Sequence, residues 1–295
     1  MNEVKLVDVT DGLKQLPDEC ADVVLIDPPY NIGKDFGNSK VQMPIEDYVS
    51  WAKEWLSESE RILKPTGTMY VYGFPEILAH LSVEIDLPKR WLAWHYTNKT
   101  VPSSQFWQRS HESIIVAWKD KEKRIFHRDE VREPYTETYI KGYGGSKKRV
   151  RPPTKGRFQN KAGKEAKETS YTVHDKGALP RDVIKVSALA GGAGKKERWF
   201  LCQDCDEVYP PGLLKQHKEH NIIKHPTQKP FELTRRLLTA AKVNDGLVVV
   251  PFVGSGSELK VARELNMNCV GFEINKNYVR LATRLMNEGE RAYYE

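Results

Sequence analysis

Apolar positions along the first part of the chain follow two alternating spacings, which predict short strands separated by a helix. Residues 21–26 form an apolar-rich run typical of a buried strand, and residues 68–72 and 113–118 have the same character. Between the first two runs, apolar residues recur at helical spacing over residues 47–63, which predicts a helix. This order indicates a parallel sheet with helices on its faces.

The same alternation returns near the end of the chain after a long interruption. It predicts strands and helices over residues 231–242 (helix), 247–250 (strand), 257–266 (helix), 269–274 (strand) and 277–288 (helix). From about residue 120 to 200 the periodicity is lost, and Lys, Arg, Gly, Pro and Ser dominate. We therefore predict one doubly wound α/β sheet assembled from residues 1–120 and 225–295, with residues 121–224 as a loop-rich insertion.

Composition argues against several classes of protein. Hydrophobic residues make up 39% of the 295 residues, which is too many for a disordered chain. The longest apolar run has seven residues, 247–253, whereas a membrane-spanning helix needs about 20. The first five residues lack the layout of a signal peptide, and four cysteines do not make a disulfide framework. We expect a cytoplasmic protein.

Positive charge is concentrated in one stretch of the insertion. Residues 141–167 hold ten Lys or Arg against a single acid, Glu165, which gives this stretch a net charge of +9. The whole chain carries +6, so the remainder is −3. A basic segment on a nearly neutral body indicates a polyanionic partner, although a solvated surface loop would have the same composition.

A glycine turn lies between the predicted strand 247–250 and the next helix. Gly254 and Gly256 allow a sharp turn and a close approach of the backbone to a ligand, and Glu273 ends the following strand, seventeen residues after Gly256. An acid at that place accepts hydrogen bonds from a ribose diol. A dinucleotide fingerprint needs a third small residue where this chain has Leu259. A ribose without a pyrophosphate fits better, which favours S-adenosylmethionine over a nicotinamide cofactor.

A second candidate site follows the strand 21–26, where Asp27, Pro28, Pro29 and Tyr30 form a rigid turn. The exocyclic amino group of a base is a poor nucleophile because its lone pair is delocalised into the ring. Hydrogen bonds to the Asp27 carboxylate and the Pro28 carbonyl would localise that lone pair, and Tyr30 could stack on the base. Attack on a methyl sulfonium would then need mainly positioning.

These motifs resemble the beta group of DNA amino-methyltransferases. The resemblance rests on residues 27–31, on the His-Pro-Thr-Gln-Lys-Pro stretch at 225–230 and on residues 251–256, in this order along the chain. It implies a Rossmann-like methyltransferase fold, S-adenosylmethionine as methyl donor, double-stranded DNA as partner and a flipped-out target base. It also implies that the region between the two blocks recognises the target.

The resemblance assigns roles residue by residue. Asp27, Pro28, Pro29 and Tyr30 match the catalytic motif. The residues that match cofactor-binding positions are Asp8, before the first predicted strand, together with Asp27, Thr227, Lys229, Phe252, Gly254, Gly256, Ser257 and Glu273. Trp94, Asn98 and Pro102 resemble a looser motif near the target base.

This chain departs from the family at two places. The family usually has an acid before the Pro-Phe pair, where this chain has Val250, and Thr where it has Ser257. One cofactor contact is therefore expected to be absent or supplied by Asp27. Because Asp27 begins the catalytic tetrapeptide, adenine N6 is the favoured target. Cytosine N4 is the alternative, since family members of that specificity more often have Ser there.

Two cysteines and two histidines in the insertion have the spacing of a zinc site. Two residues separate Cys202 from Cys205, eleven separate Cys205 from His217, and His220 follows on the same face of a helix predicted over 213–220. Two thiolates and two imidazoles suit tetrahedral Zn²⁺. His225 could replace His220 as the fourth ligand. Such a site would stabilise the insertion without taking part in the chemistry.

Two other classes of function stay open at this point. A nicotinamide-dependent oxidoreductase is disfavoured by Leu259 and leaves residues 27–30 unexplained. A DNA-binding protein without enzymatic activity would use the zinc site and the basic stretch, and would leave both α/β motifs without a role. A homodimer and a restriction endonuclease partner are compatible with the resemblance, as is an origin in a prokaryote or phage, but none of them follows from the residues.

Overall fold

The computed structural model describes residues 2–33, 42–98, 103–143, 148–150, 168–170, 173–190 and 197–288. The chain divides into two compact units, Met1–His127 with Arg181–Glu295, and Arg128–Pro180. Residues 181–224, which the sequence assigned to the insertion, therefore belong to the larger unit. The role of the insertion in target recognition stays a prediction.

The larger unit is built on one eight-stranded sheet with the strand order β1-β13-β12-β2-β3-β5-β4-β8. In that order, the strands are β1 (Asn2–Leu6), β13 (Asn268–Glu273), β12 (Leu247–Val250), β2 (Ala21–Ile26), β3 (Leu63–Gly73), β5 (His111–Ala117), β4 (Lys89–His95) and β8 (Val183–Lys185). The first five strands are parallel, and β5 is antiparallel to both of its neighbours. Both halves of the chain contribute strands, which confirms the predicted fold class.

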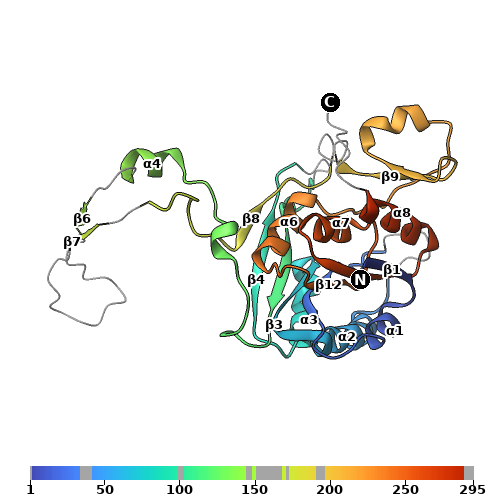
Figure 1. The fold of residues 1–295 in the computed structure, drawn as a ribbon, viewed down its shortest axis with the longest axis horizontal. Helices are drawn as coiled ribbons and strands as arrows, with labels where there is room; N and C mark the ends of the chain where they lie inside the picture. Colours follow the sequence, from blue (N-terminus) through green and yellow to red (C-terminus); the bar gives the residue numbers. More distant parts are fainter. Residues whose placement is uncertain are drawn as a thin grey trace. The chain divides into compact units, whose positions relative to one another are not determined.

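Helices cover both faces of this sheet (Figure 1). One face carries α1 (Val9–Lys14), α2 (Ile45–Ile62) and α3 (Pro75–Val83), and the other carries α6 (Phe231–Ala240), α7 (Ser257–Glu264) and α8 (Lys276–Asn287). Along β2, Val23 and Leu25 pack into one core while Val24 and Ile26 pack into the other. A strand buried on both faces explains why residues 21–26 are apolar except for Asp22. None of the described helices has both the length and the apolar composition needed to span a bilayer.

The elements predicted from periodicity are present with shifted ends, and the largest difference concerns β3. The sequence predicted a strand over residues 68–72, whereas β3 begins at Leu63, directly after α2. Its pairing with β2 shifts register between Ala21 and Val23. At Gly67 a Cβ atom would lie 2.9 Å from the backbone oxygen of Asp22. The glycine therefore allows β2 and β3 to approach closely at this place.

Residues 199–223 form a small module that packs on α8. It contains β9 (Phe200–Cys202), β10 (Glu207–Tyr209), the 3₁₀ helix η2 (Pro211–His217) and β11 (Ile222–Ile223), with β9 in the centre of a three-stranded antiparallel sheet. Leu201 and Val208 bury their side chains against Leu281 and Leu285 of α8. Asp206 adds ion pairs to the α8 residues Arg280 and Arg284. The helix predicted over 213–220 is thus a 3₁₀ helix that ends at residue 217.

The smaller unit has little regular structure among its described residues. It contains the 3₁₀ helix η1 (Arg128–Glu130), α4 (Glu137–Tyr143) and the antiparallel pair of β6 (Lys148–Val150) and β7 (Glu168–Ser170). Arg132 donates to the backbone oxygen of Gly177, and the rings of Tyr135 and Tyr139 stack with their centroids 4.7 Å apart. Most of the basic stretch 141–167 lies outside the described residues.

Candidate active site

A cavity of about 470 Å³ opens where the parallel strands of the larger unit end. Carboxyl ends of parallel strands meet at one edge of a sheet. Because β5 is antiparallel to β3, its first residues lie at the same edge. The structure brings together nearly all of the predicted site residues in the lining, namely Asp8, Asp27, Pro28, Pro29, Tyr30, Thr227, Lys229, Phe252, Gly254, Ser257 and Glu273.

Asp27 lies directly after β2, and its carboxylate is held by Lys229. The ammonium nitrogen of Lys229 is 2.7 Å from each of the two carboxylate oxygens, although the two residues are 202 positions apart. The side chain of Lys229 is only 6% exposed and that of Asp27 is 16% exposed. Oδ1 also accepts from the Tyr30 hydroxyl, whereas Oδ2 keeps a second lone pair, so Asp27 can still accept a hydrogen bond from a ligand.

Glu112, at the start of β5, is a second carboxylate at this place that the sequence analysis did not identify. The Tyr30 hydroxyl donates to Asp27 Oδ1 at 2.9 Å and lies 3.1 Å from Glu112 Oε2. Tyr96 donates to the other Glu112 oxygen at 3.3 Å. An acid just before the apolar run of 113–118 was the available signal, but its meaning depends on the antiparallel direction of β5.

The environment of Lys229 favours its charged form. Burial opposes the charge, but the carboxylates of Asp27 and Glu112 outweigh this effect and raise the pKa of Lys229 above its usual value. The rings of Tyr30 and Tyr72 lie 5.1 and 5.3 Å from the ammonium nitrogen and add cation–π attraction. Burial and the same two carboxylates raise the pKa of Tyr30 well above its usual value, so its hydroxyl remains a hydrogen-bond donor.

The glycine turn after β12 joins the ribose-binding candidate Glu273 to the cavity. The backbone N–H of Gly254 donates to Glu273 Oε2 at 2.9 Å, and the N–H of Asn275 donates to Oε1 at 2.8 Å. Gly254 has φ +53°, and a Cβ atom there would lie 2.9 Å from the ring of His225. Burial raises the pKa of Glu273, an effect that these backbone donors partly offset.

Among the residues matched to the catalytic and cofactor-binding motifs, all of which the structure describes, only Gly256 does not line the cavity. It precedes α7 with φ +83°, and a Cβ atom there would lie 2.7 Å from Cα of Ala282 on α8. The structure therefore places Gly256 where α7 and α8 approach closely, which is a packing role.

Replacing Gly256 with alanine is expected to lower the free energy of unfolding by about 1–3 kcal/mol, because a left-handed backbone and a backbone clash both oppose a side chain. Denaturant unfolding measures this change. Alanine at Gly212, where a Cβ atom would meet nothing within 4 Å, is the control. Unchanged stability of Gly256→Ala would contradict the packing role.

The residues that resemble the looser target-base motif are only partly described. Trp94 lines the cavity, and its indole N–H donates to the backbone oxygen of Val186 at 2.8 Å. Asn98 bonds to both the N–H and the carbonyl of Ala188 and so holds the segment after β8. Pro102 lies outside the described residues. Asp8 follows β1, where its side chain caps α1 by accepting from the N–H of Thr10.

The charge of the cavity restricts which ligand it can take. Five carboxyl groups and two cationic side chains line it. The carboxyl groups belong to Asp8, Asp27, Glu112, Glu258 and Glu273, and the cationic side chains are Arg198 and Lys229. Lys229 is already engaged with Asp27 and Glu112. Such a lining attracts a cationic ligand and repels a pyrophosphate.

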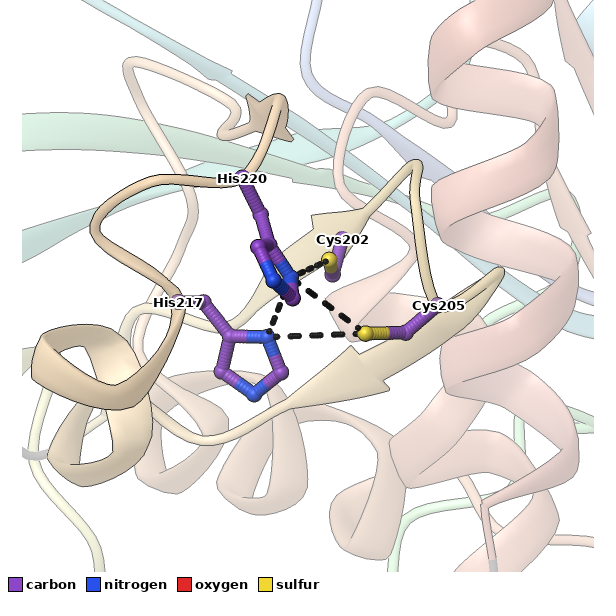
Figure 2. Close-up of side chains that lie close together, drawn as sticks. All are labelled: Cys202, Cys205, His217 and His220. Carbon is purple, nitrogen blue, oxygen red and sulfur yellow. Dashed lines mark hydrogen bonds between the residues drawn. The ribbon is translucent and has the colours of Figure 1, made fainter.

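The predicted zinc ligands form a second cluster, in the module on α8. Figure 2 shows the side chains of Cys202, Cys205, His217 and His220 converging, and their ligand atoms all lie within 4.8 Å of one another. The thiol–imidazole distances are 3.2–3.7 Å, and the two Nδ1 atoms are 3.3 Å apart. A tetrahedron around Zn²⁺ at ordinary bond lengths has edges of about 3.6 Å between S and N and about 3.3 Å between two N atoms.

Two further observations bear on this cluster. His225 is not part of it, because His225 lines the cavity and packs against Tyr278 at 4.8 Å between ring centroids. Burial opposes ionisation of Cys202, but hydrogen bonds from Cys205 and the two imidazoles lower the pKa of the Cys202 thiol to about 6. The arrangement is able to hold a tetrahedral metal ion with thiolate ligands.

The fold is a doubly wound α/β sheet with a cavity at the carboxyl ends of its parallel strands, and comparisons identify its family. A model of the DNA methylase family with N6 and N4 specificities matches residues 21–284. The chain belongs to this family and is a DNA amino-methyltransferase.

Its relatives and structural neighbours are methyltransferases as well. It is 27% identical to the type II methyltransferase M.HpaI of Haemophilus parainfluenzae over 92% of this chain and 69% of that protein. It is 25% identical to the DNA adenine methyltransferase YhdJ of Escherichia coli over 97% and 84%. The fold is similar to the M1.HpyAVI–SAM complex, with a TM-score of 0.56, 17% identity and coverage of 98% and 100%. It is also similar to the cytosine-N4-specific PvuII DNA methyltransferase, with a TM-score of 0.61, 15% identity and coverage of 99% and 89%.

Proposed function

We propose that this protein transfers a methyl group from S-adenosylmethionine to N6 of an adenine that is flipped out of double-stranded DNA. The observation that carries the proposal is the Asp27 carboxylate, which lies at the cavity directly after β2, fixed by Lys229 and beside Tyr30. A fixed acceptor at this place can bind an exocyclic amino group.

The cavity suits S-adenosylmethionine in charge and in shape. The sulfonium and ammonium groups of this molecule match a lining rich in carboxylates, and Glu273 offers oxygens to a ribose diol. Gly254 keeps the backbone free of a side chain where the turn meets His225. Phe252 adds an apolar surface at the cavity wall, with Trp51 and Trp55 packed behind it at 5.8 and 5.4 Å between ring centroids.

The residues of the chain act on the amino group of the base. Asp27 and the Pro28 carbonyl accept its two hydrogen atoms and localise the nitrogen lone pair. S-adenosylmethionine supplies an electrophilic methyl group, so an N–C bond forms while the C–S bond breaks and sulfur keeps the electron pair. The nitrogen then loses a proton, for which the Asp27 carboxylate is the nearest acceptor. Lys229 holds that carboxylate in its orientation until then.

Adenine is favoured over cytosine by the acidic first residue of the catalytic tetrapeptide, and a relative of the chain is an adenine methyltransferase. Expression in a methylation-deficient bacterial host, followed by modified-base sequencing of its DNA, tests both base and target sequence. We expect N6-methyladenine in one short motif. N4-methylcytosine would assign the alternative specificity, and unmodified DNA from a well-expressed protein would contradict the proposal.

We further propose that Cys202, Cys205, His217 and His220 hold one structural Zn²⁺. The close agreement of their interatomic distances with a tetrahedron supports this. Because the ligand set leaves no open position, the ion would stabilise the module on α8 and would take no part in methyl transfer.

The basic stretch 141–167 is proposed to bind DNA phosphates. Neutralising Lys147, Lys148, Arg149 and Arg151 as Gln should weaken DNA binding, and the slope of log affinity against log salt should fall by roughly 0.9 per lost phosphate contact. Affinity for free S-adenosylmethionine and the preferred sequence should not change.

Fluorescence anisotropy with a labelled duplex at several salt concentrations measures this slope. Replacing Lys14 and Lys53, which lie on α1 and α2, is the control and should leave it unchanged. An unaltered slope in the fourfold variant would mean that the stretch does not contact DNA. A changed target sequence would mean that it reads bases directly.

A further inference from the structure

Glu258 is a buried acid that the proposed methyl transfer does not use. It lies in the first turn of α7, lines the cavity and is only 3% exposed. Its Oε2 atom accepts a hydrogen bond from the Ser257 hydroxyl at 2.8 Å, and the Ser255 hydroxyl donates to that of Ser257 at 3.2 Å. A chain of hydroxyl groups thus fixes the carboxylate at the cavity wall.

This position is unfavourable for a carboxylate when no ligand is bound. Burial and the nearby charge of Asp27 raise the pKa of Glu258 to about 7, against a partly compensating effect of Ser257 and Lys229. Lys229 is committed to Asp27, with 2.7 Å to both carboxylate oxygens. A buried acid of this kind gains a full partner only when a cation enters the cavity.

The sheet order places the helix that carries Glu258 between the proposed positions of the ribose and of the methyl group. Strand β12 lies between β13, which ends at Glu273, and β2, which precedes Asp27. Glu258 belongs to the helix that follows β12. In S-adenosylmethionine the sulfur carries the ribose, the methyl group and the methionine chain as three separate substituents. A ligand with its ribose at Glu273 and its methyl group at Asp27 therefore has its sulfur at the end of β12, from which the methionine chain can extend along the start of α7.

We propose that Glu258 binds the α-ammonium group of S-adenosylmethionine. This inference rests on the proposed function, because it assigns a residue to one end of the same ligand. It also accounts for Val250: the chain lacks an acid before the Pro-Phe pair and has one at Glu258 on the opposite side of the glycine turn.

Isothermal titration with three ligands tests the assignment in the full chain. Glu258→Gln should bind S-adenosylmethionine roughly 10- to 100-fold more weakly than the wild type does, which is the effect of losing a hydrogen bond between charged groups. Decarboxylated S-adenosylmethionine keeps the ammonium group, so its affinity should fall by a similar factor in the variant. Methylthioadenosine lacks the ammonium group of the methionine portion and should bind equally well to both proteins. Glu264→Gln, which removes the same charge from the far end of α7, is the matched control.

Each result separates this inference from the proposed function. Unchanged binding of S-adenosylmethionine to Glu258→Gln, or equal weakening of methylthioadenosine, would overturn the role of Glu258. A wild-type protein that binds none of the three ligands would overturn the proposed function as well. Glu258→Asp keeps the charge on a shorter side chain, so it should lose less affinity than the glutamine variant. If Glu258→Gln does not fold, an aspartate variant that binds all three ligands as the wild type does would overturn the role.

Discussion

Replacement of Asp27 by asparagine is expected to slow methyl transfer by roughly 10²- to 10³-fold, and Asp27→Ala should be at least as slow. The carboxylate accepts a hydrogen bond that strengthens as the amino group attacks, so its loss acts mainly on the transition state. An amide keeps the shape of the side chain but offers one oxygen instead of two and carries no charge. Single-turnover transfer of labelled methyl groups to duplex DNA measures the rate.

The buried ion pair with Lys229 provides a control for this prediction. Removing the charge of Asp27 alone leaves the ammonium group of Lys229, whose side chain is 6% exposed, with Glu112 at 4.0 Å as its remaining carboxylate. Asp27→Asn is therefore expected to unfold at a lower temperature than the wild type. The double variant Asp27→Asn with Lys229→Met removes both charges, and it should recover stability without recovering activity.

Two outcomes would contradict the assigned chemistry. One is a near wild-type rate for Asp27→Asn, which would mean that the carboxylate does not act on the amino group. The other is recovery of methyl transfer together with stability in the double variant, which would mean that Asp27 supports only the fold.

Loss of the proposed zinc site is expected to have the largest effect on stability. The wild-type protein should contain about one zinc per chain, and the double variant Cys202→Ser with Cys205→Ser should contain none. Structural zinc contributes about 10–16 kcal/mol of apparent binding free energy in isolated zinc-finger peptides. The hydrophobic cluster of the module at 199–223 contains only Trp199, Leu201 and Val208 as buried residues of the module, and its other buried members lie on α8. The module should therefore unfold locally without the ion.

Metal analysis by mass spectrometry and hydrogen exchange of residues 199–223 measure these effects. The affinity for S-adenosylmethionine should change much less than the exchange rates, since none of the four ligands lines the cavity described here. Cys20→Ser, a half-buried free cysteine outside the cluster, is the control and should retain zinc. Protein purified without chelator that holds no metal, with wild-type exchange in the double variant, would rule out a zinc site.

The local spacing of apolar residues predicted the strands and helices that are buried on one or both faces. The apolar run at 21–26 became β2, and helical spacing at 47–63 and 277–288 became α2 and α8. These predictions succeeded because periodicity reports which faces are buried, whichever partner buries them. The same reasoning predicted no strand at 89–95, where β4 has mostly exposed or half-buried residues and so lacks a clear alternation.

Short motifs determined most of the candidate chemistry, because their residues are close together in sequence. Asp27 and Tyr30 share one turn, and Cys202 and Cys205 share another. Spacing alone could not choose between His220 and His225 as the fourth member of the cluster with Cys202, Cys205 and His217. The tertiary structure decided this, since the turn after η2 returns His220 to Cys202 while the next segment carries His225 to the glycine turn.

Contacts between distant segments were decided only by the tertiary structure. Asp27 meets Lys229 across 202 positions, and Tyr30 meets Glu112 across 82, because β2 ends and β5 begins at one edge of the sheet, where the segment before α6 also lies. Tertiary packing also places Gly256 against α8 and Glu258 at the cavity wall. The sequence by itself determines which residue types are available for chemistry, whereas strand order and direction determine which of them meet.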